Sequence, residues 1–334
     1  MIKEAIQKLT NGEDLSNEMV ETVMDEIMSG EASPIHMSAY LIALRMKSET
    51  TNEITASAVG MRKHGIHLNP ERDVLEIVGT GGDESNSFNI STTASIVMSA
   101  AGIPVAKHGN RSVSSKCGAA DVLEALGVNI TIPPEKMQAV LDETGIAFMF
   151  AQIYHSAMKY VGPVRRELAT KTIFNILGPL TNPANANMQL MGVYSENLVE
   201  PMAQVLINLG VKRGMVVYGQ DGLDEISLSA PTTCCEIRDG KLNSYVLTPK
   251  DFGLTTCTKS DLVGGDANTN AEITRAILNG EKGAKRDAVL INAAACFHFI
   301  KDVSFKEGVK LAADIIDSGK AMAKLNAFIE ATNA

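Results

Sequence analysis

The segment Glu76–Thr92, with the sequence EIVGTGGDESNSFNIST, constrains the rest of the chain most strongly. A short apolar run leads into the glycine-rich turn Gly79–Asp83, and a second apolar run, Ala94–Ala101, follows the polar residues Asn89–Thr92. This order predicts a buried strand, a glycine loop and the start of a helix. Glycines let backbone N–H groups approach an anion closely, and a helix N-terminus also favours phosphate. The segment therefore predicts a phosphate-binding loop, with an ordinary tight turn as the alternative.

The loop differs from two common phosphate-binding motifs. Gly79-x-Gly81 lacks the third glycine of the dinucleotide fingerprint, because Glu84 occupies that position. No Gly-Lys-Ser/Thr follows, so the segment is not a P-loop. Asn89, Ser91 or Thr92 is expected to cap the following helix.

Composition and charge exclude several classes of protein. The 334 residues suggest about two domains, and the net charge of −9 argues against a nucleic-acid-binding surface. The five cysteines form no Cys-x-x-Cys pair, which indicates unpaired thiols in a reducing cytoplasm. The charged N-terminus does not resemble a signal peptide, and no apolar run approaches the ~18 residues of a membrane span. We therefore expect a cytoplasmic protein that contacts neither nucleic acid nor membrane.

Residues 1–65 show helical periodicity only. Four short helices are expected, with Asn11-Gly12, Gly30 and Ser33-Pro34 as boundaries between the first three and Thr51 at the start of the fourth. Such a small bundle cannot bury all of its apolar stripes alone. It has to pack against the other domain or against another subunit.

After Asn69-Pro70 the pattern changes to alternating strands and helices. This alternation predicts an α/β domain with a mostly parallel central sheet, in which ligands lie at the carboxyl ends of strands. The expected strands are 75–78, 103–106, 146–148, 189–193 and 215–218, the expected helices are 91–101, 119–126, 135–143, 197–209, 272–278, 287–299 and 305–329, and strand-like hairpin material covers 232–262.

A second polar segment, Lys107–Lys116, follows the expected strand at 103–106. It holds three cations with several hydroxyl and amide groups, and we expect it to be a loop that binds phosphate. The alternative is a polar connection in which Ser114 or Ser115 caps the next helix.

Two further features are weaker when each is taken alone. Pro163 is expected to start a helix, which would place Arg165 in its first turn, although a surface arginine is the alternative. Asp224 and Glu225 follow the expected strand at 215–218. Adjacent carboxylates there suit Mg²⁺ bridged to phosphates, although an acidic turn has the same sequence pattern.

Taken together, Gly79–Asp83, Asn89–Thr92, Lys107–Arg111 and Asp224-Glu225 resemble the anthranilate phosphoribosyltransferase family over essentially the whole chain. The resemblance implies a small helical domain, here 1–68 with a helical contribution from about 160–182. Beside it would lie a large α/β domain, here 72–334, in a homodimer. The implied reaction joins anthranilate to 5-phosphoribosyl 1-pyrophosphate on the route to tryptophan.

The resemblance also implies the site residues. The residues that would hold the phosphoribosyl donor are Gly79, Gly82, Asp83, Ser87, Asn89, Ile90, Ser91, Thr92, Lys107, His108, Gly109, Asn110, Arg111, Ser112, Val113, Ser114, Ser115 and Ala119. Anthranilate would contact Gly79, Asn110 and Arg165, and two Mg²⁺ ions per subunit would be bound through Ser91, Asp224 and Glu225. Catalytic roles would fall to Lys107, His108 and Asn110, with His108 either positioning the acceptor or packing the loop.

The sequence departs from the family pattern at two places. Ser87 stands where the family usually has Thr, which keeps the hydroxyl, and Leu168-Ala169-Thr170-Lys171 replaces a commoner Leu-Gly-Ile-Arg. The second departure puts the local hinge geometry in doubt. The two domains are expected to be joined near Asn69-Pro70 and Gly162-Pro163, so that they can close on the substrates and exclude water.

The chemistry of the implied reaction agrees with the residue types. An aromatic amine is neutral at pH 7, so we expect no catalytic His–carboxylate pair. A pyrimidine nucleoside phosphorylase is a rival hypothesis, but it needs no metal pair such as Asp224-Glu225. A non-catalytic nucleic-acid-binding relative is the other rival, and the net charge of −9 speaks against it.

Overall fold

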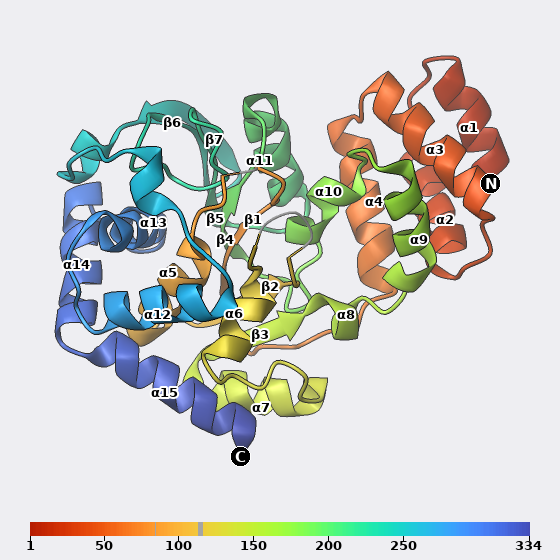
Figure 1. Cartoon of the computed structure of the whole chain (residues 1–334). Coiled ribbons are helices and arrows are strands. Elements are labelled where there is room, and N and C mark those ends of the chain that lie inside the picture. The colour runs from red at the N-terminus through yellow and green to blue at the C-terminus, as the bar shows by residue number, and fades with distance from the viewer. Residues whose placement is uncertain (84, 113–115) are drawn as a thin grey trace.

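The computed structural model describes residues 1–83, 85–112 and 116–334. A helical bundle lies on one side of a larger α/β unit, and the chain passes from one to the other after residue 65 (Figure 1). Three of the expected donor-binding residues, Val113, Ser114 and Ser115, lie outside the described residues.

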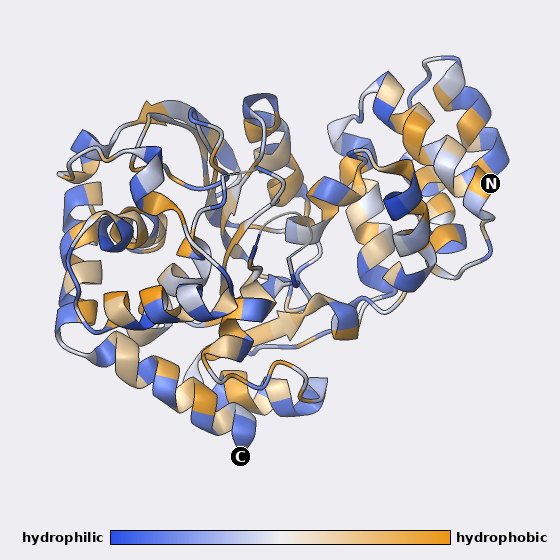
Figure 2. Ribbon diagram, in the orientation of Figure 1, coloured by the Kyte–Doolittle hydropathy of each residue, from blue (hydrophilic) through white to orange (hydrophobic). Residues whose placement is uncertain are grey.

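The N-terminal bundle has the four expected helices. They are α1 (Ile2–Thr10), α2 (Asn17–Met28), α3 (Pro34–Lys47) and α4 (Thr51–Lys63). Ser16 and Ser33 cap α2 and α3 by accepting backbone N–H groups, and Thr50 forms a capping box with Glu53. Hydrophobic and hydrophilic residues alternate around these helices (Figure 2), which is the pattern of helices that are buried on one side.

A later part of the chain completes the bundle. After α8 (Ala151–Tyr154), the helices α9 (Met158–Leu168) and α10 (Phe174–Leu177) pack beside α1–α4 (Figure 1). The prediction that Pro163 starts a helix is wrong, because Pro163 lies inside α9. Burial of Val161 and Val164 against the bundle offsets the hydrogen bond that the proline removes.

This correction moves two other expectations. Gly162-Pro163 is not a link between domains, since both residues belong to α9. Arg165 lies in the last turn of α9 instead of the first turn of a helix. Helix α9 ends at Leu168, and Ala169, which follows it, has a left-handed conformation with φ of 48°.

Seven strands of the described chain form one sheet in the order β3-β2-β1-β4-β5-β6-β7. They are β1 (Leu75–Gly79), β2 (Val105–Gly109), β3 (Ile146–Phe150), β4 (Met188–Gly192), β5 (Arg213–Gly219), β6 (Thr232–Arg238) and β7 (Lys241–Leu247). The pairs from β3 through β5 are parallel, and β6 and β7 add antiparallel at one edge. The expected α/β class with a mostly parallel sheet is confirmed.

Strand β2 starts later and runs further than the sequence suggested. It continues to Gly109, paired with β3, so Lys107 and His108 belong to the strand instead of the following loop. Both side chains are buried, which explains how polar residues can extend a strand at this position.

Helices cover both faces of the sheet. The helices of the α/β unit are α5 (Ile90–Ala100), α6 (Ala119–Ala125), α7 (Pro134–Thr144), α11 (Val199–Asn208), α12 (Ala267–Leu278), α13 (Ala284–Lys301), α14 (Phe305–Asp317) and α15 (Lys320–Asn333), with short 3-10 turns η1 (Gly178–Leu180), η2 (Glu196–Leu198), η3 (Pro249–Phe252) and η4 (Lys259–Leu262). Along β5, Met215 and Val217 join the core that contains α5 and α13, whereas Val216 joins a second core shared with α11 and the bundle. The sheet is therefore buried on both faces.

Two expectations for the C-terminal part need correction. The helix expected over 305–329 is divided into α14 and α15, because Gly319 adopts φ of 76° between them. The hairpin ends at Leu247, and residues 248–262 carry 3-10 turns. Of the helices in the described residues, none is by itself both long and apolar enough to cross a membrane, and only the sharply bent pair α13–α14 passes that test by length and composition.

Candidate active site

The carboxyl ends of β1 and β4 come together beside the turn that follows β5. Gly79 and Gly192 are paired at these ends. A Cβ atom at Gly79 would overlap the Asp224 carboxylate, and one at Gly192 would overlap the Asp224 backbone. Both glycines are therefore required because the Asp224 segment crosses directly over the two strand ends.

Asp224 and Glu225 join the glycine loop to the start of α5. Asp224 Oδ2 accepts the Gly81 N–H at 2.7 Å, and Glu225 Oε1 accepts the Ser91 N–H at 3.2 Å. Burial, together with repulsion from Asp83, raises the pKa of Asp224 to about 7. Burial and repulsion from Asp224 raise the pKa of Glu225 to about 8. The site thus holds more negative charge than its surroundings neutralise.

The same region fits a hard cation bound jointly with a phosphate ligand. Within the part of the chain that the structure describes, no three His, Cys, Asp or Glu side chains gather into a ready-made metal cage. Mg²⁺ needs only one or two carboxylates and takes its other ligands from water and phosphates. Asp83 also has a buried carboxylate oxygen without a protein partner in the described chain, which adds to the unmet demand for positive charge.

Lys107 is the buried cation behind these carboxylates. Its Nζ donates to the Ile77 carbonyl at 2.6 Å and to Ser91 Oγ at 3.3 Å. Burial lowers the pKa of Lys107, whereas Glu76, Glu225 and Asp224 oppose that effect. The lysine therefore ties β1 to the first turn of α5 and places one positive charge beneath the site.

Glu76 on β1 and His108 on β2 form a second buried polar group. Glu76 Oε1 accepts the His108 N–H at 3.0 Å, and His108 Nδ1 lies 3.3 Å from the Gly178 carbonyl. Because a carbonyl only accepts, Nδ1 carries the ring proton and Nε2 is left without a partner among the described residues. Burial, with the neighbouring His155, lowers the pKa of His108 to about 3. His108 is thus a neutral, packed side chain with one acceptor nitrogen to spare.

The loop after β2 is organised by carboxylates on α6. Asp121 accepts the N–H groups of Ser112 and Gly118, each at 2.9 Å. Arg111 is paired with Asp121 at 3.0 Å and with Glu124 at 2.8 Å, and these two carboxylates raise its pKa. Arg111 is therefore already neutralised in this conformation. Gly118 takes the cap position of α6, so neither Ser114 nor Ser115 precedes that helix directly.

The start of α5 is stabilised by groups from other segments. Asn89 occupies the cap position, but its side chain makes no capping hydrogen bond. Its amide donates to the Cys117 carbonyl at 3.3 Å and accepts from Asn270 at 2.9 Å. The Glu225 carboxylate instead takes a free N–H of the first turn, at Ser91. Asn89 therefore connects the glycine-loop segment to the loop after β2.

Arg165 lies on the bundle side. Its guanidinium carbon is 5.8 Å from the centroid of the Phe174 ring, and the side chain is half-buried. Burial lowers the pKa of Arg165. A half-buried cation stacked on a ring differs from the solvent-exposed arginine that was the alternative.

The structure brings several of the expected segments together, and it adds other residues. The glycine loop, the first turn of α5, Lys107 and the carboxylates Asp224 and Glu225 converge at one edge of the sheet. Sequence reasoning missed Asp121 and Asn292; the latter holds the Glu225 turn because its amide accepts the Ile226 N–H at 3.0 Å. The strand-ending Gly192 was also missed, although a glycine closing an apolar run was a visible signal.

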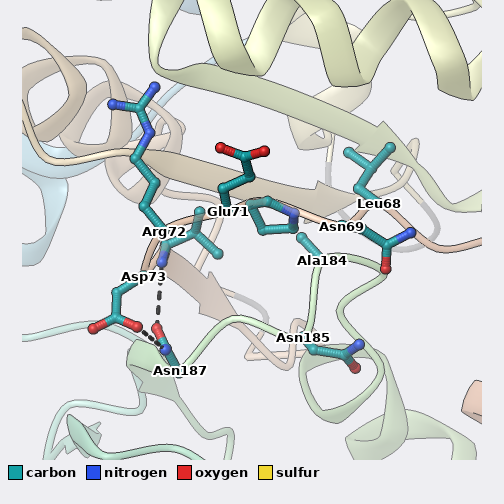
Figure 3. Close-up of a pocket in the computed structure, with 10 residues that line it drawn as sticks. Leu68, Asn69, Glu71, Arg72, Asp73, Ala184, Asn185 and Asn187 are labelled. Atoms are coloured by element: carbon teal, nitrogen blue, oxygen red, sulfur yellow. Dashed lines mark hydrogen bonds between the residues drawn. The ribbon is translucent and has the colours of Figure 1, made fainter.

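A pocket of about 330 Å³ lies elsewhere, at the entry to β1 (Figure 3). Its lining includes Arg72, Asp73, Asn185 and Asn187, and Asn187 bonds both Asp73 and the Val74 N–H. The pocket is at the amino ends of β1 and β4, whereas the glycine loop and the carboxylates described above are at their carboxyl ends. It is therefore separate from the candidate active site.

Comparison with known proteins gives a consistent family. A model described as "Glycosyl transferase family, helical bundle domain" matches residues 3–65, and one described as "Glycosyl transferase family, a/b domain" matches residues 71–322. An anthranilate phosphoribosyltransferase from Lachnoclostridium phytofermentans is 67% identical, over 100% of this chain and 99% of the relative. The enzyme of the same name from Methanobrevibacter smithii is 62% identical, over 100% of both.

Solved structures agree in fold over nearly the whole chain. Anthranilate phosphoribosyltransferase from Thermus thermophilus is 43% identical with a TM-score of 0.94, covering 99% of each chain. The Saccharomyces cerevisiae enzyme in complex with PRPP and Mg is 28% identical with a TM-score of 0.92, covering 99% of this chain and 98% of that one.

Proposed function

Because the chain belongs to the anthranilate phosphoribosyltransferase family, we propose that it transfers the phosphoribosyl group from 5-phosphoribosyl 1-pyrophosphate to the amine of anthranilate, in an Mg²⁺-dependent step of tryptophan biosynthesis. The products are N-(5-phosphoribosyl)anthranilate and pyrophosphate. The observation that carries the proposal is the pair of adjacent carboxylates, the half-buried Asp224 and the buried Glu225, held against the glycine loop and the first turn of α5.

The donor is assigned to the edge of the sheet where these segments meet. The Gly79–Asp83 loop, the residues Asn89–Thr92 and the segment from Lys107 to Ala119 supply N–H groups, hydroxyls and cations suited to phosphate oxygens. Thr92 adds a buried hydroxyl that has no partner among the described residues. The Saccharomyces cerevisiae relative solved with PRPP and Mg supports this choice of donor.

The residues present fit Mg²⁺ held by Asp224, Glu225 and Ser91, with two ions per subunit as the proposed number. When bound, Mg²⁺ would neutralise negative charge on the departing pyrophosphate. Lys107, fixed by Ile77 and Ser91, is placed where its ammonium group would add positive charge beneath the pyrophosphate.

The acceptor is assigned to the space between the glycine loop and the bundle side, with Gly79, Asn110 and Arg165 as contacts. The attacking amine of anthranilate is neutral at pH 7, so no side chain has to remove a proton before attack. His108, neutral and buried near the end of β2, is suited to orienting the loop that carries Asn110, with its Nε2 as an acceptor. A Saccharomyces cerevisiae relative was solved in complex with 4-fluoroanthranilate, which supports this acceptor class.

We also assign the exposed face of α3 to a second copy of this chain. Ile35 and Met46 are each 79% exposed on that helix. Apolar residues of α9, α10 and α11 pack against the buried stripes of the bundle, whereas Ile35 and Met46 are the most exposed large apolar side chains among the described residues, which favours this face for a subunit contact.

The deciding experiment follows the loss of anthranilate fluorescence with donor and Mg²⁺, beside thymidine or uridine with phosphate. We expect anthranilate to be turned over and the two nucleosides not to be.

The double variant Asp224→Asn with Glu225→Gln keeps the side-chain shapes and the acceptors for the Gly81 and Ser91 N–H groups, so the protein should still fold. Turnover should fall by ~10²-fold or more, because charge stabilisation at the leaving group is lost. Turnover equal to the parent at saturating Mg²⁺ would refute the metal assignment, and phosphorolysis of a nucleoside would refute the reaction.

A further inference from the structure

The turn between α9 and α10 carries Lys171 to the edge of the glycine loop. Its Nζ lies 3.2 Å from the Gly82 carbonyl and 3.7 Å from the centroid of the Tyr194 ring. Gly82 belongs to the proposed donor loop, and Tyr194 follows β4. A cation from the bundle side thus reaches across to two groups of the α/β unit.

The backbone that presents Lys171 is fixed on both sides. Arg45 on α3 donates to the Lys171 carbonyl at 2.6 Å and also to the Thr170 hydroxyl. On the other side, the Thr172 N–H donates to Asn175 Oδ1 at 2.9 Å. The left-handed Ala169 turns the chain out of α9 immediately before this point. The lysine therefore starts from a held position, so little backbone freedom is lost when its side chain binds a ligand.

The charge of Lys171 is not cancelled in this structure. Its partners are a carbonyl and an aromatic ring, and no ion pair joins it to a carboxylate in the described residues. Arg111, by contrast, is paired with Asp121 and Glu124. An ammonium has three N–H donors, of which the Gly82 carbonyl takes one. The positive charge of Lys171 and its remaining N–H donors are therefore available to a phosphate group bound at the glycine loop.

We propose that Lys171 is a further donor-binding residue, which contacts the diphosphate of the phosphoribosyl donor and is delivered to it from the bundle side. This inference rests on the proposed function. The diphosphate is favoured over the 5-phosphate because Lys171 meets the glycine loop at Gly82, next to Asp83 and to the carboxylates assigned to Mg²⁺. Lys171 then links donor binding to the approach of the two parts of the molecule.

The test compares Lys171→Met, Lys171→Arg and the control Lys159→Met in the full-length protein. Lys159 also lies over an aromatic ring, that of Tyr160 at 4.9 Å, but on α9 away from the turn. In Lys171→Met, the donor KM and the inhibition constant of pyrophosphate with Mg²⁺ should each rise about tenfold, as expected for a lost charge-assisted contact. The anthranilate KM should stay within about twofold. Lys171→Arg should remain within about threefold of the parent for the donor, and Lys159→Met should match the parent.

Two readouts separate this role from a purely structural one. The donor KM of the parent should rise more steeply with salt than that of Lys171→Met, because a charge contact is screened. Calorimetric titration with pyrophosphate and Mg²⁺ measures the contact without the acceptor, so it decides the inference even if anthranilate is not turned over. Unchanged pyrophosphate affinity in Lys171→Met would overturn the inference, as would a fall in kcat alone or an equal effect in Lys159→Met.

Discussion

At the scale of single residues, Arg165 is the sharpest test of acceptor recognition. Anthranilate carries a carboxylate beside its amine, and a guanidinium pairs with a carboxylate through two parallel hydrogen bonds. Arg165 is half-buried and stacked on Phe174, so its charge is partly desolvated before substrate arrives. We expect Arg165→Ala to cost ~1.5–3 kcal/mol of binding, or roughly ten- to a hundredfold in the anthranilate KM.

The matched control is Arg166→Ala, since Arg166 is the exposed neighbour on the same helix. Steady-state kinetics with each substrate varied in turn should show no change for Arg166→Ala and a donor KM that barely moves for Arg165→Ala. An unchanged anthranilate KM, or equal rises for both substrates, would show that Arg165 does not bind the acceptor carboxylate. The helix N-terminus plays no part in this recognition, because Arg165 lies in the last turn of α9.

Residues with a local signal could be predicted from the sequence, and residues that act through long-range contacts could not. Gly79, Lys107 and Asp224 stand in segments whose composition indicates phosphate or metal chemistry. Asp121 and Lys171 carry no such signal, because only the fold shows that they contact the loop after β2 and Gly82. A sequence pattern predicts which chemical groups a residue is able to bind, whereas the fold determines which residues and ligands lie within contact distance of it.

At the scale of secondary-structure elements, β6 and α13 are joined by a buried carboxylate and an imidazole. His298 Nε2 lies 3.6 Å from Glu236 Oε1, and His298 Nδ1 lies 2.7 Å from the Val303 carbonyl. Glu236 raises the pKa of His298. Burial favours a higher pKa for Glu236, but His298, Arg238 and Tyr245 outweigh it and lower that pKa to about 2. Two further residues border this pair. Asp302 forms an ion pair with Arg238, and the Phe305 ring packs against the His298 ring.

These shifts predict how stability depends on pH. A histidine with a raised folded-state pKa stabilises the fold fully below its ordinary pKa of ~6.5, and this contribution is lost as pH rises through the folded value. Glu236 stays ionised throughout that window. The variant His298→Asn can keep a donor to the Val303 carbonyl but carries no charge. We expect its loss of unfolding free energy, on the order of 1 kcal/mol, to be largest near pH 6 and smallest near pH 8.5.

Chemical denaturation of both proteins at several pH values measures this difference. Glu236→Gln provides the control background. In that background, the loss of unfolding free energy caused by His298→Asn should change little with pH, because the carboxylate that raises the histidine pKa is absent. A difference between parent and His298→Asn that grows as pH rises would contradict the assignment, because it would require a lowered pKa.

The elements themselves were predictable wherever periodicity and boundary residues agreed. Helix α3 begins at Ser33-Pro34 and α4 begins at Thr51, as the sequence predicts, and the side chains of Ser33 and Thr50 cap them. The errors have physical causes of a tertiary kind: β2 extends because pairing with β3 buries Lys107 and His108, and α9 continues through Pro163 because its valines are buried. Both outcomes depend on partners far away in the chain.

At the scale of the whole molecule, the bundle and the α/β unit share one of the two hydrophobic cores. The second core includes helices of the bundle, α11 and one face of the sheet, for example Val216 and Ile237. Contacts near the proposed site, such as Arg45 with Lys171 and Lys171 with Gly82, also join the two parts. If the two parts move relative to each other when substrates bind, the shared hydrophobic core has to stay packed while these polar contacts rearrange. This favours a small rotation of the bundle over a wide opening.

The assembly of the molecule gives the last prediction. Ile35 and Met46 lie about three turns apart on α3, on the same side of the helix, and each is 79% exposed. Two large apolar side chains on one helix face suit a self-complementary contact about a two-fold axis.

We expect the parent to scatter light as a particle of about twice 35.6 kDa at micromolar concentration. The variant Ile35→Lys with Met46→Lys should scatter as a monomer with unchanged helix content. Val246→Lys, a control at an apolar residue of β7 that is 53% exposed, should remain dimeric. A parent that scatters as a single 35.6 kDa chain, or a double variant that stays dimeric, would show that α3 is not the subunit interface.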